Sequence, residues 1–271
     1  LVTQTGEINA SSSALLDAQQ LFSIQSGGSV AISNAADLTA TDIEVGVGNG
    51  DSSTSTLSLL GFSSTITQSG SSTLQIGGAG TESGTVLLNG SVNFTTGTGA
   101  VTIGDTGTLD IQLGTFNANG NLVLSSGANI SLDGGNLNAN AGFDNSARGT
   151  LDMPDGKLTV TGGALVPSGG SFVVEGGGGF GDQPHLELGA GATANLTGTL
   201  GAGSFEQGEL SITSGAAITS DRGLFGAASG GLGIGSVDGA GSTWIVTQDL
   251  IVGGNGAGNL TISNGAHVDN S

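Results

Sequence analysis

Apolar and polar residues alternate along the chain in short runs, and turns rich in glycine separate these runs. The clearest repeat pairs Gly208–Ile218 with Gly258–Val268 at an offset of 50 residues. Each copy reads apolar, any, apolar, any, any, Gly, any, any, apolar. Alternation with a period of two is typical of a strand with one buried face, and the glycine predicts a tight turn. The repeating unit is therefore a strand, a turn and a second strand.

The same template recurs through the rest of the chain. Its anchors are Phe22, Ile24, Gly27 and Val30; Leu122, Leu124, Gly127 and Ile130; Leu158, Val160, Gly163 and Val166; and Leu186, Leu188, Gly191 and Ala194. Shorter alternating pieces lie between them, at Leu57 and Leu59, Leu74 and Ile76, Val86 and Leu88, Val92 and Phe94, Val101 and Ile103, and Leu109, Ile111 and Leu113. Strands this short cannot bury an apolar face singly, so they must stack on one another. The pattern predicts an all-β chain folded as a right-handed parallel β-helix, a β-solenoid, with roughly 20–25 residues per coil and about 11–13 coils.

The alternation also predicts which side chains face the interior. We expect Leu210, Ile212, Leu260 and Ile262 to be buried, and Trp244 to be a packing anchor at a coil corner. Glycine is expected at the corners because tight turns between coil faces need a positive φ.

Two segments leave the local structure open. The spacing of apolar residues in Ala14–Phe22 hints at a helix, which we interpret as a strand or a short capping turn. Seven asparagines crowd one stretch, at Asn117, Asn119, Asn121, Asn129, Asn136, Asn138 and Asn140. They could form stacked amide ladders, or they could be turn residues in the left-handed conformation.

Composition supports a packed chain of small side chains. Glycine supplies 54 of the 271 residues, yet 36% of the residues are hydrophobic and the mean hydropathy is +0.19. Disordered chains have low hydrophobicity, so the apolar residues must pack together. No proline-rich linker interrupts the pattern, and we expect residues 1–271 to form a single β-helix domain.

Charge excludes several classes of partner. Three Lys and Arg residues stand against 22 Asp and Glu residues, for a net charge of −19. Such a chain has almost nothing with which to neutralise phosphate, which excludes nucleic acid and argues against anionic lipid. No apolar run approaches the ~18 residues of a spanning helix, so direct membrane insertion of this chain is not expected. No cysteine is present, so disulfides and thiolate sites are excluded.

The last quarter of the chain carries a family resemblance. Gly239–Trp244, Asp249–Gly253 and Gly258–Val268 resemble the repeat of bacterial autotransporter (type V secretion) passengers and of PEP-CTERM surface proteins. The clearest repeats span residues 208–271. The resemblance implies a secreted β-helical protein, located outside the cell or on the bacterial cell surface, that acts as an adhesin or biofilm component.

The two ends of the sequence suggest a piece of a longer secreted chain. Leu1-Val2-Thr3 lacks the basic stretch of a leader, so the chain is either cytoplasmic or a mature fragment. Proteins of the resembled families end in a membrane β-barrel or a short sorting tail, whereas this sequence ends partway through a repeat, at Ser271. We expect an excised fragment.

Catalysis is the weaker functional hypothesis. A polysaccharide lyase would need clustered cations, but Arg148, Lys157 and Arg222 lie far apart in the sequence. A glycosidase needs two close carboxylates with aromatic platforms for sugar rings. Asp152 and Asp155 are close in sequence, but we interpret them as solvated loop residues. We expect no enzyme and no catalytic residues, and we leave a carbohydrate-active β-helix as the second alternative.

The leading hypothesis is an adhesin or scaffold segment that binds cell-surface or matrix ligands and mediates attachment or biofilm formation. The first alternative is a self-assembling filament subunit of an extracellular matrix, in which self-association is the main contact. Stacking of exposed coil edges would favour the filament, and a groove lined by clustered carboxylates and cations would favour the enzyme.

One irregular insertion is the best candidate for a local site. Four glycines interrupt the strand pattern there, and Glu175, Asp182, His185 and Glu187 collect around them. Carboxylates with one imidazole could bind a divalent cation such as calcium, but an exposed loop explains the same residues, and we favour the loop. No cofactor is expected otherwise.

The net charge of −19 generates a prediction about self-association. Repulsion between chains should favour monomers at low salt, and sodium chloride or calcium should promote association by screening or bridging carboxylates. Sedimentation with chelator, with added sodium chloride and with millimolar calcium measures this. An equal monomer fraction in all three conditions contradicts charge-mediated association.

Overall fold

The described structure consists almost entirely of parallel strands wound into solenoid coils. The computed structural model describes residues 6–48, 52–78, 80–178 and 182–271, so Leu1, Val2 and Thr3 lie outside them. Within these ranges the helical content is one short 3-10 turn, η1 (Ser168–Gly170). The chain makes about 11 turns of a β-solenoid, which confirms the expected fold class. No helix among the described residues is long and apolar enough to cross a bilayer.

The chain divides into two compact units. Unit 1 comprises Leu1–Ala139 and Ala147–Asp152, and unit 2 comprises Asn140–Ser146 and Met153–Ser271. The expectation of a single domain over residues 1–271 stays a prediction.

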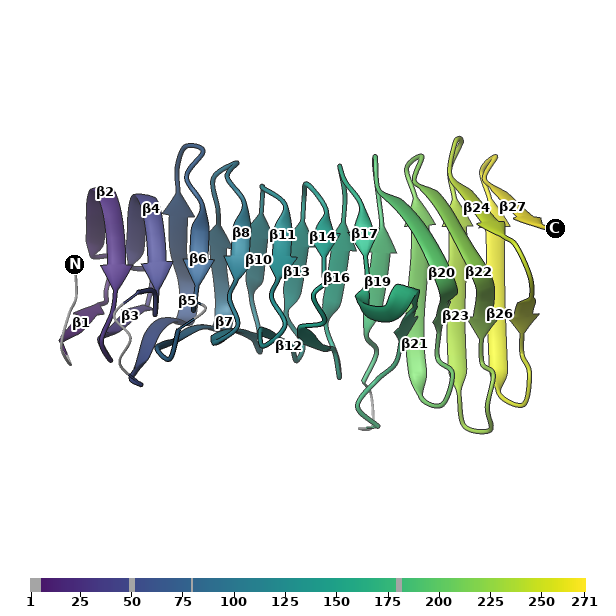
Figure 1. Cartoon of the computed structure of the whole chain (residues 1–271), viewed down its shortest axis with the longest axis horizontal. Coiled ribbons are helices and arrows are strands. Elements are labelled where there is room, and N and C mark those ends of the chain that lie inside the picture. The colour runs from purple at the N-terminus through teal and green to yellow at the C-terminus, as the bar shows by residue number, and fades with distance from the viewer. Residues whose placement is uncertain (1–5, 49–51, 79, 179–181) are drawn as a thin grey trace. The chain divides into compact units, whose positions relative to one another are not determined.

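Unit 1 is built from strands that stack in three columns. Its strands are β1 (Glu7–Ala10), β2 (Leu15–Ile24), β3 (Ser29–Ser33), β4 (Asp37–Val45), β5 (Thr54–Gln68), β6 (Leu74–Ile76), β7 (Ser83–Thr95), β8 (Val101–Ile103), β9 (Gly107–Ile111), β10 (Thr115–Ala118), β11 (Leu122–Leu124), β12 (Asn129–Leu132), β13 (Asn136–Ala139) and β15 (Thr150–Asp152). The first column runs β1, β3, β5, β7, β9, β12 and β15 (Figure 1). The second joins β2, β4, β5, β7, β10 and β13, and the third joins β2, β4, β6, β8 and β11. The long strands belong to two columns because they turn a corner, and a register shift after Phe62 marks the corner in β5.

Continuous apolar rows fill the interior of unit 1. One row takes the same register position in successive strands, with every member at most 1% exposed: Val30, Leu57, Val86, Leu109 and Ile130. The rings of Phe94 and Phe116 stack between coils with centroids 4.8 Å apart. Burial of each aliphatic side chain contributes about 1.5–3 kcal/mol, so the rows hold the coils together.

Unit 2 repeats this organisation. Its strands are β14 (Phe143–Asp144), β16 (Lys157–Val160), β17 (Leu165–Val166), β18 (Phe172–Val174), β19 (His185–Leu188), β20 (Thr193–Ala202), β21 (Gln207–Thr213), β22 (Ala217–Phe225), β23 (Leu232–Asp238), β24 (Thr243–Val246), β25 (Leu250–Val252), β26 (Ala257–Ser263) and β27 (His267–Asn270). β16, β19, β21, β23 and β26 form one column. A second contains β18, β20, β22 and β25, and a third contains β20, β22, β24 and β27. β14 pairs with β17 beside them.

Trp244 is a packing anchor in the interior of unit 2, as expected, although it lies within β24 rather than at a corner. Its side chain is fully buried, and its ring meets Phe225 edge to face with centroids 5.9 Å apart. The indole Nε1 donates a hydrogen bond of 3.0 Å to the hydroxyl of Ser220. The one polar atom of the ring is therefore satisfied inside the core.

Glycine occupies the turns for two different reasons. Gly27 and Gly191 have φ values of 77° and 73°, the left-handed region that glycine adopts without strain. Gly127 and Gly163 do not, but a Cβ atom at either position would collide with the backbone of the preceding coil, at Asp105 and Ala141 respectively. Close approach of neighbouring coils therefore selects glycine independently of turn geometry.

Coil length varies more than the sequence spacing predicts. Thr115 pairs with Asn136, 21 residues later, whereas Ile43 pairs with Leu74, 31 residues later. The paired strands keep their register on either side of these connections of different length.

Two of the four expected core positions are confirmed. Leu210 and Ile212 are 1% and 0% exposed. Leu260 is only half-buried, and Ile262 is 50% exposed, so the expected burial of these two is wrong. Both lie in β26, which pairs with β23 on one side only in the described structure. Their inward faces therefore lack the second neighbour that covers Leu210 and Ile212.

The face assignment fails at two further anchors. Val166 is 37% exposed because its neighbour in β17, Leu165, faces the core in its place. Leu165 is 1% exposed. Leu113 continues the alternation of β9 but lies beyond the end of that strand, and it is 51% exposed.

The first open segment is a strand, and four of the seven asparagines, Asn117, Asn129, Asn136 and Asn138, lie in strands. Residues 14–22 fall largely within β2, as interpreted. Asn138 Nδ2 donates to Asn117 Oδ1 at 2.8 Å, and Asn117 Nδ2 donates to Thr95 Oγ1 at 3.3 Å. None of the seven asparagines has a positive φ among the described residues. An amide ladder therefore forms at this row, and the left-handed alternative is wrong for these asparagines.

Replacement of Ile212 by Asp should lower the free energy of unfolding by about 4 kcal/mol or more, because it places an unpaired charge in a closed apolar row. Ile262→Asp is the matched control in the same column, and at 50% exposure it should cost no more than about 1 kcal/mol. Urea unfolding of both variants measures the difference. Equal losses contradict the assignment of the buried face.

Candidate functional site

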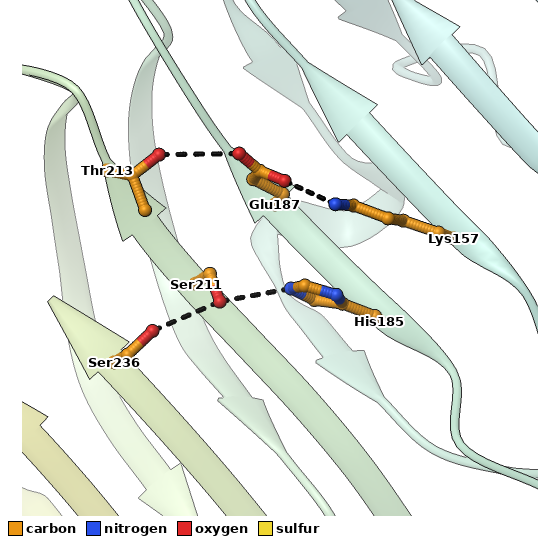
Figure 2. Close-up of polar contacts among 6 residues, drawn as sticks. All are labelled: Lys157, His185, Glu187, Ser211, Thr213 and Ser236. Carbon is orange, nitrogen blue, oxygen red and sulfur yellow. Dashed lines mark hydrogen bonds and ion pairs between the residues drawn. The ribbon is translucent and has the colours of Figure 1, made fainter. Parts of the chain in front are cut away.

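Polar side chains gather on the outer face of one strand column of unit 2 (Figure 2). Alternation along β19 buries Leu186 and Leu188 completely and directs His185 and Glu187 outward. Because the strands pair in parallel register, the positions paired with His185 and Glu187 in neighbouring coils also face outward. Side chains distant in sequence therefore meet on one surface. We call this surface the outer polar band; it consists of Lys157, His185, Glu187, Ser211, Thr213 and Ser236.

Glu187 joins three coils through its two carboxylate oxygens. Lys157 Nζ lies 2.5 Å from Oε2, and Thr213 Oγ1 donates a hydrogen bond of 3.4 Å to Oε1. Burial raises the pKa of Glu187, but the hydrogen bond and charge of Lys157, with smaller contributions from His185 and Thr213, outweigh burial and lower that pKa below its ordinary value. Glu187 is therefore ionised at neutral pH.

Three residues form a hydroxyl chain that ends on an imidazole. Ser236 Oγ donates to Ser211 Oγ at 3.0 Å, and Ser211 Oγ lies 3.0 Å from His185 Nε2. Because Ser211 accepts from Ser236, its own proton is available to donate to Nε2. A donating Ser211 pairs with a neutral ring that carries its proton on Nδ1, whereas a ring protonated on Nε2 donates to Ser211 instead.

The surroundings of His185 favour the neutral form of the ring. Burial lowers the pKa of the imidazole most strongly, and the positive charge of Lys157 lowers it further. The carboxylates of Glu209 and Glu187 raise it, but the net pKa remains below that of a solvated histidine.

The Ser211–His185 contact pairs a serine hydroxyl with an imidazole. A serine hydroxyl beside a histidine is the pair that acyl transfer requires, together with an orienting group and donors for the oxyanion. Glu209 lies opposite His185 in register, but Ser211 is only 8% exposed, so a substrate carbonyl has little access to its oxygen. We interpret the contact as a tie between coils.

Unit 1 contains ties of the same kind without histidine. Thr39 Oγ1 donates to Asp17 Oδ1 at 2.8 Å, and Thr65 Oγ1 donates to Asp37 Oδ1 at 2.6 Å. Each joins neighbouring coils on an outward face. The recurrence of these ties supports a structural role for the outer polar band.

The structure does not assemble the four candidate metal ligands into one site. His185 and Glu187 share the outer face of β19, whereas Glu175 Oε1 accepts a hydrogen bond of 2.9 Å from the backbone N–H of Phe205. Among the residues that the structure describes, no three His, Asp or Glu side chains are placed to hold a metal ion. Part of the insertion, residues 179–181, lies outside the described residues, and calcium binding stays a prediction.

Two of the three cationic side chains pair with carboxylates. Lys157 meets Glu187, and Arg222 Nη2 lies 2.9 Å from Asp249 Oδ2 on an exposed surface, where such a pair contributes little stability. Arg148 sits in a turn with φ of 69°. Asp152 belongs to unit 1 and Asp155 to unit 2.

Sequence reasoning missed a buried carboxylate in unit 1. Glu82 is 2% exposed, and its Oε1 accepts hydrogen bonds from the backbone N–H of Ser26 at 2.6 Å and from Ser55 Oγ at 3.0 Å. These partners come from two earlier coils, 56 and 27 residues away. It also missed Ser211, Thr213 and Ser236, because their role depends on the register between coils, which no local pattern encodes.

The comparisons with protein-family models, with curated proteins and with solved structures gave no match. The resemblance to autotransporter passengers and PEP-CTERM surface proteins therefore stays a prediction. Function has to be argued from the surfaces of the molecule, since the fold alone does not specify it.

The lowered pKa of His185 predicts a pH dependence of stability. Its pKa is lower in the folded than in the unfolded chain, so the unfolded state takes up the proton first as the pH falls. Stability should drop between about pH 7.5 and 5, and His185→Gln should reduce this drop. His267→Gln, at an exposed position of β27 outside the outer polar band, is the control for loss of a histidine. Chemical unfolding at a series of pH values measures both, and identical profiles for wild type and His185→Gln contradict the assignment.

Proposed function

We propose that the chain is a non-catalytic extracellular segment, an adhesin or scaffold, that attaches cells to surface or matrix ligands. One observation carries this proposal: outward-facing polar side chains stand in register across successive coils of unit 1. One row consists of Asp17, Thr39, Thr67, Thr95, Asn117 and Asn138. The second, two residues upstream, consists of Asp37, Thr65, Asn93, Thr115 and Asn136. We call the two rows the polar array.

Hydrogen bonds along the rows hold the array in place before any ligand binds. The ties Thr39 to Asp17 and Thr65 to Asp37 cover its N-terminal coils, and the ladder from Asn138 through Asn117 to Thr95 covers its C-terminal coils. Side chains that are already ordered lose little conformational entropy on binding, which favours adhesion.

The geometry of the array suits a ligand that is itself repetitive. Neighbouring members of a row lie one strand spacing apart, roughly 4.8 Å, and the two rows lie two residues apart along each strand, roughly 7 Å. A polymer or a cell surface with many similar groups can engage several members at once. Individually weak contacts then combine into firm attachment.

Charge narrows the class of ligand. The array contains Asp17 and Asp37 and no cation, and the whole chain carries a net charge of −19. Nucleic acids and other polyanions are repelled, so uncharged or cationic ligands are favoured.

Beads coated with the protein test the adhesive function. They should attach to cells or to matrix material several-fold better than bare beads, and Thr67→Val combined with Thr95→Val should reduce attachment while preserving side-chain shape. Thr219→Val, in β22 of unit 2, is the control outside the array and should have no effect. Attachment equal to that of bare beads overturns the adhesive function, and full attachment of the double variant overturns the role of the array.

A further inference from the structure

A groove lies on the surface of unit 1 at the corner that leads into the polar array. Its volume is about 490 Å³, and Phe62, Asn89, Ser91 and Leu113 are among the residues that line it. Phe62 precedes Thr65 in β5, and Leu113 precedes Thr115 in β10, so the groove borders the upstream row of the array.

The groove arises from an alternation of large and small residues in three successive coils. Phe62 and Leu113 belong to the outer two coils, and the middle coil contributes Gly90 and Ser91, with Ser91 opposite Phe62 in register. Gly90 has φ of 120°, and a Cβ atom on it would collide with the carbonyl oxygen of Gly61. The backbone of the neighbouring coil therefore keeps the middle of the groove open.

Phe62 is held with its ring facing solvent. It is 74% exposed, the highest value among the exposed large apolar side chains of the described chain, and Leu113 is 51% exposed. The carbonyl of Phe62 accepts a hydrogen bond of 2.9 Å from the N–H of Ala35, which fixes the backbone at this point. Phe62 and Leu113 therefore give the groove an exposed apolar surface.

The polar side chains in the lining, Asn89 and Ser91, are uncharged, and Asn89 is already oriented. Asn89 Nδ2 donates to Gln112 Oε1 at 2.9 Å, and Gln112 Nε2 donates to Asp110 Oδ2 at 3.0 Å. This chain of hydrogen bonds leaves one N–H of the Asn89 amide and its carbonyl oxygen as available groups in the lining. Ser91 adds an exposed hydroxyl.

We propose that this groove binds an uncharged oligosaccharide, with one sugar ring stacked on Phe62 and its hydroxyls hydrogen-bonded to Asn89 and Ser91. A pyranose has an apolar C–H face and an equatorial rim of hydroxyls, which match the aromatic face and the amide and hydroxyl groups. The groove spans two coil spacings, roughly 10 Å, the length of a short oligosaccharide. The array beyond it would receive further sugars of a longer chain. The inference rests on the proposed adhesive function and names its ligand class.

A protein partner fits the groove less well. A stable protein interface buries about 800 Å² on each side around several apolar anchors, whereas Phe62 and Leu113 are the two large exposed apolar side chains in this lining. Anionic glycans are disfavoured by the net charge of −19.

Calorimetric titration of the soluble protein with cellohexaose, laminarihexaose and mannohexaose tests the proposal. At least one should bind, and Phe62→Ala should weaken its binding about tenfold, since the variant lacks the aromatic face on which the sugar ring stacks. Phe205→Ala is the matched control, because Phe205 is 63% exposed but lies in unit 2, and it should bind as wild type does. Ser91→Phe keeps the Phe62 ring but fills the groove, and it should abolish binding.

Several results would overturn the site. If none of the three hexasaccharides binds, the ligand class is wrong. If wild type, Phe62→Ala and Ser91→Phe bind equally well, the groove is not the binding site. Binding of an uncharged leucine-containing pentapeptide, with none of the sugars bound, assigns the groove to a protein partner instead. If coated beads still attach to cells while none of the sugars binds, the ligand class is wrong and the adhesive function is not contradicted. The two results are independent because attachment is measured without these sugars.

Discussion

The in-register stacking of short parallel strands is the constraint on which the rest of this structure depends. A single strand here has three to fifteen residues in unit 1 and cannot cover its own apolar face. Stacking places like residues at the same position in every coil, so that Val30, Leu57 and Val86 form one row inside. The same operation places Thr67, Thr95 and Asn117 in one row outside. The stacking that makes the core regular therefore makes the outer surface regular as well.

The sequence predicts the fold class and most of the buried face because both follow from local alternation. Leu186, Leu188, Leu210 and Ile212 are assigned correctly from a period of two within their own strands. The errors occur where a neighbour beyond the local window decides the outcome. Ile262 is exposed because β26 has one stacked neighbour, and Val166 is exposed because β17 has shifted by one residue relative to the template.

The candidate site was less predictable than the fold. The insertion around Glu175 is a candidate cation site in the sequence because its acidic residues and His185 are close together there. In the structure, Glu175 accepts a hydrogen bond from the backbone of Phe205, whereas His185 and Glu187 lie on a strand face. Ser211 and Thr213, the hydroxyl partners of His185 and Glu187, lie 26 residues further along the chain, and Lys157 lies in the preceding coil. Contacts of this kind depend on coil length, and coil length varies along the chain. Periodicity shows which residues face outward, but it does not show which outward-facing residues of different coils will be neighbours.

The variation in coil length has a consequence for how such a chain can change. Register is maintained through the strands alone, so a 31-residue step between Ile43 and Leu74 coexists with a 21-residue step between Thr115 and Asn136. Insertions are therefore tolerated at the corners and not within the strands, where one added residue would exchange the two faces. Each corner is a point at which a lineage can lengthen a loop without altering the core. The scaffold can thus acquire new recognition loops one corner at a time while its interior stays the same.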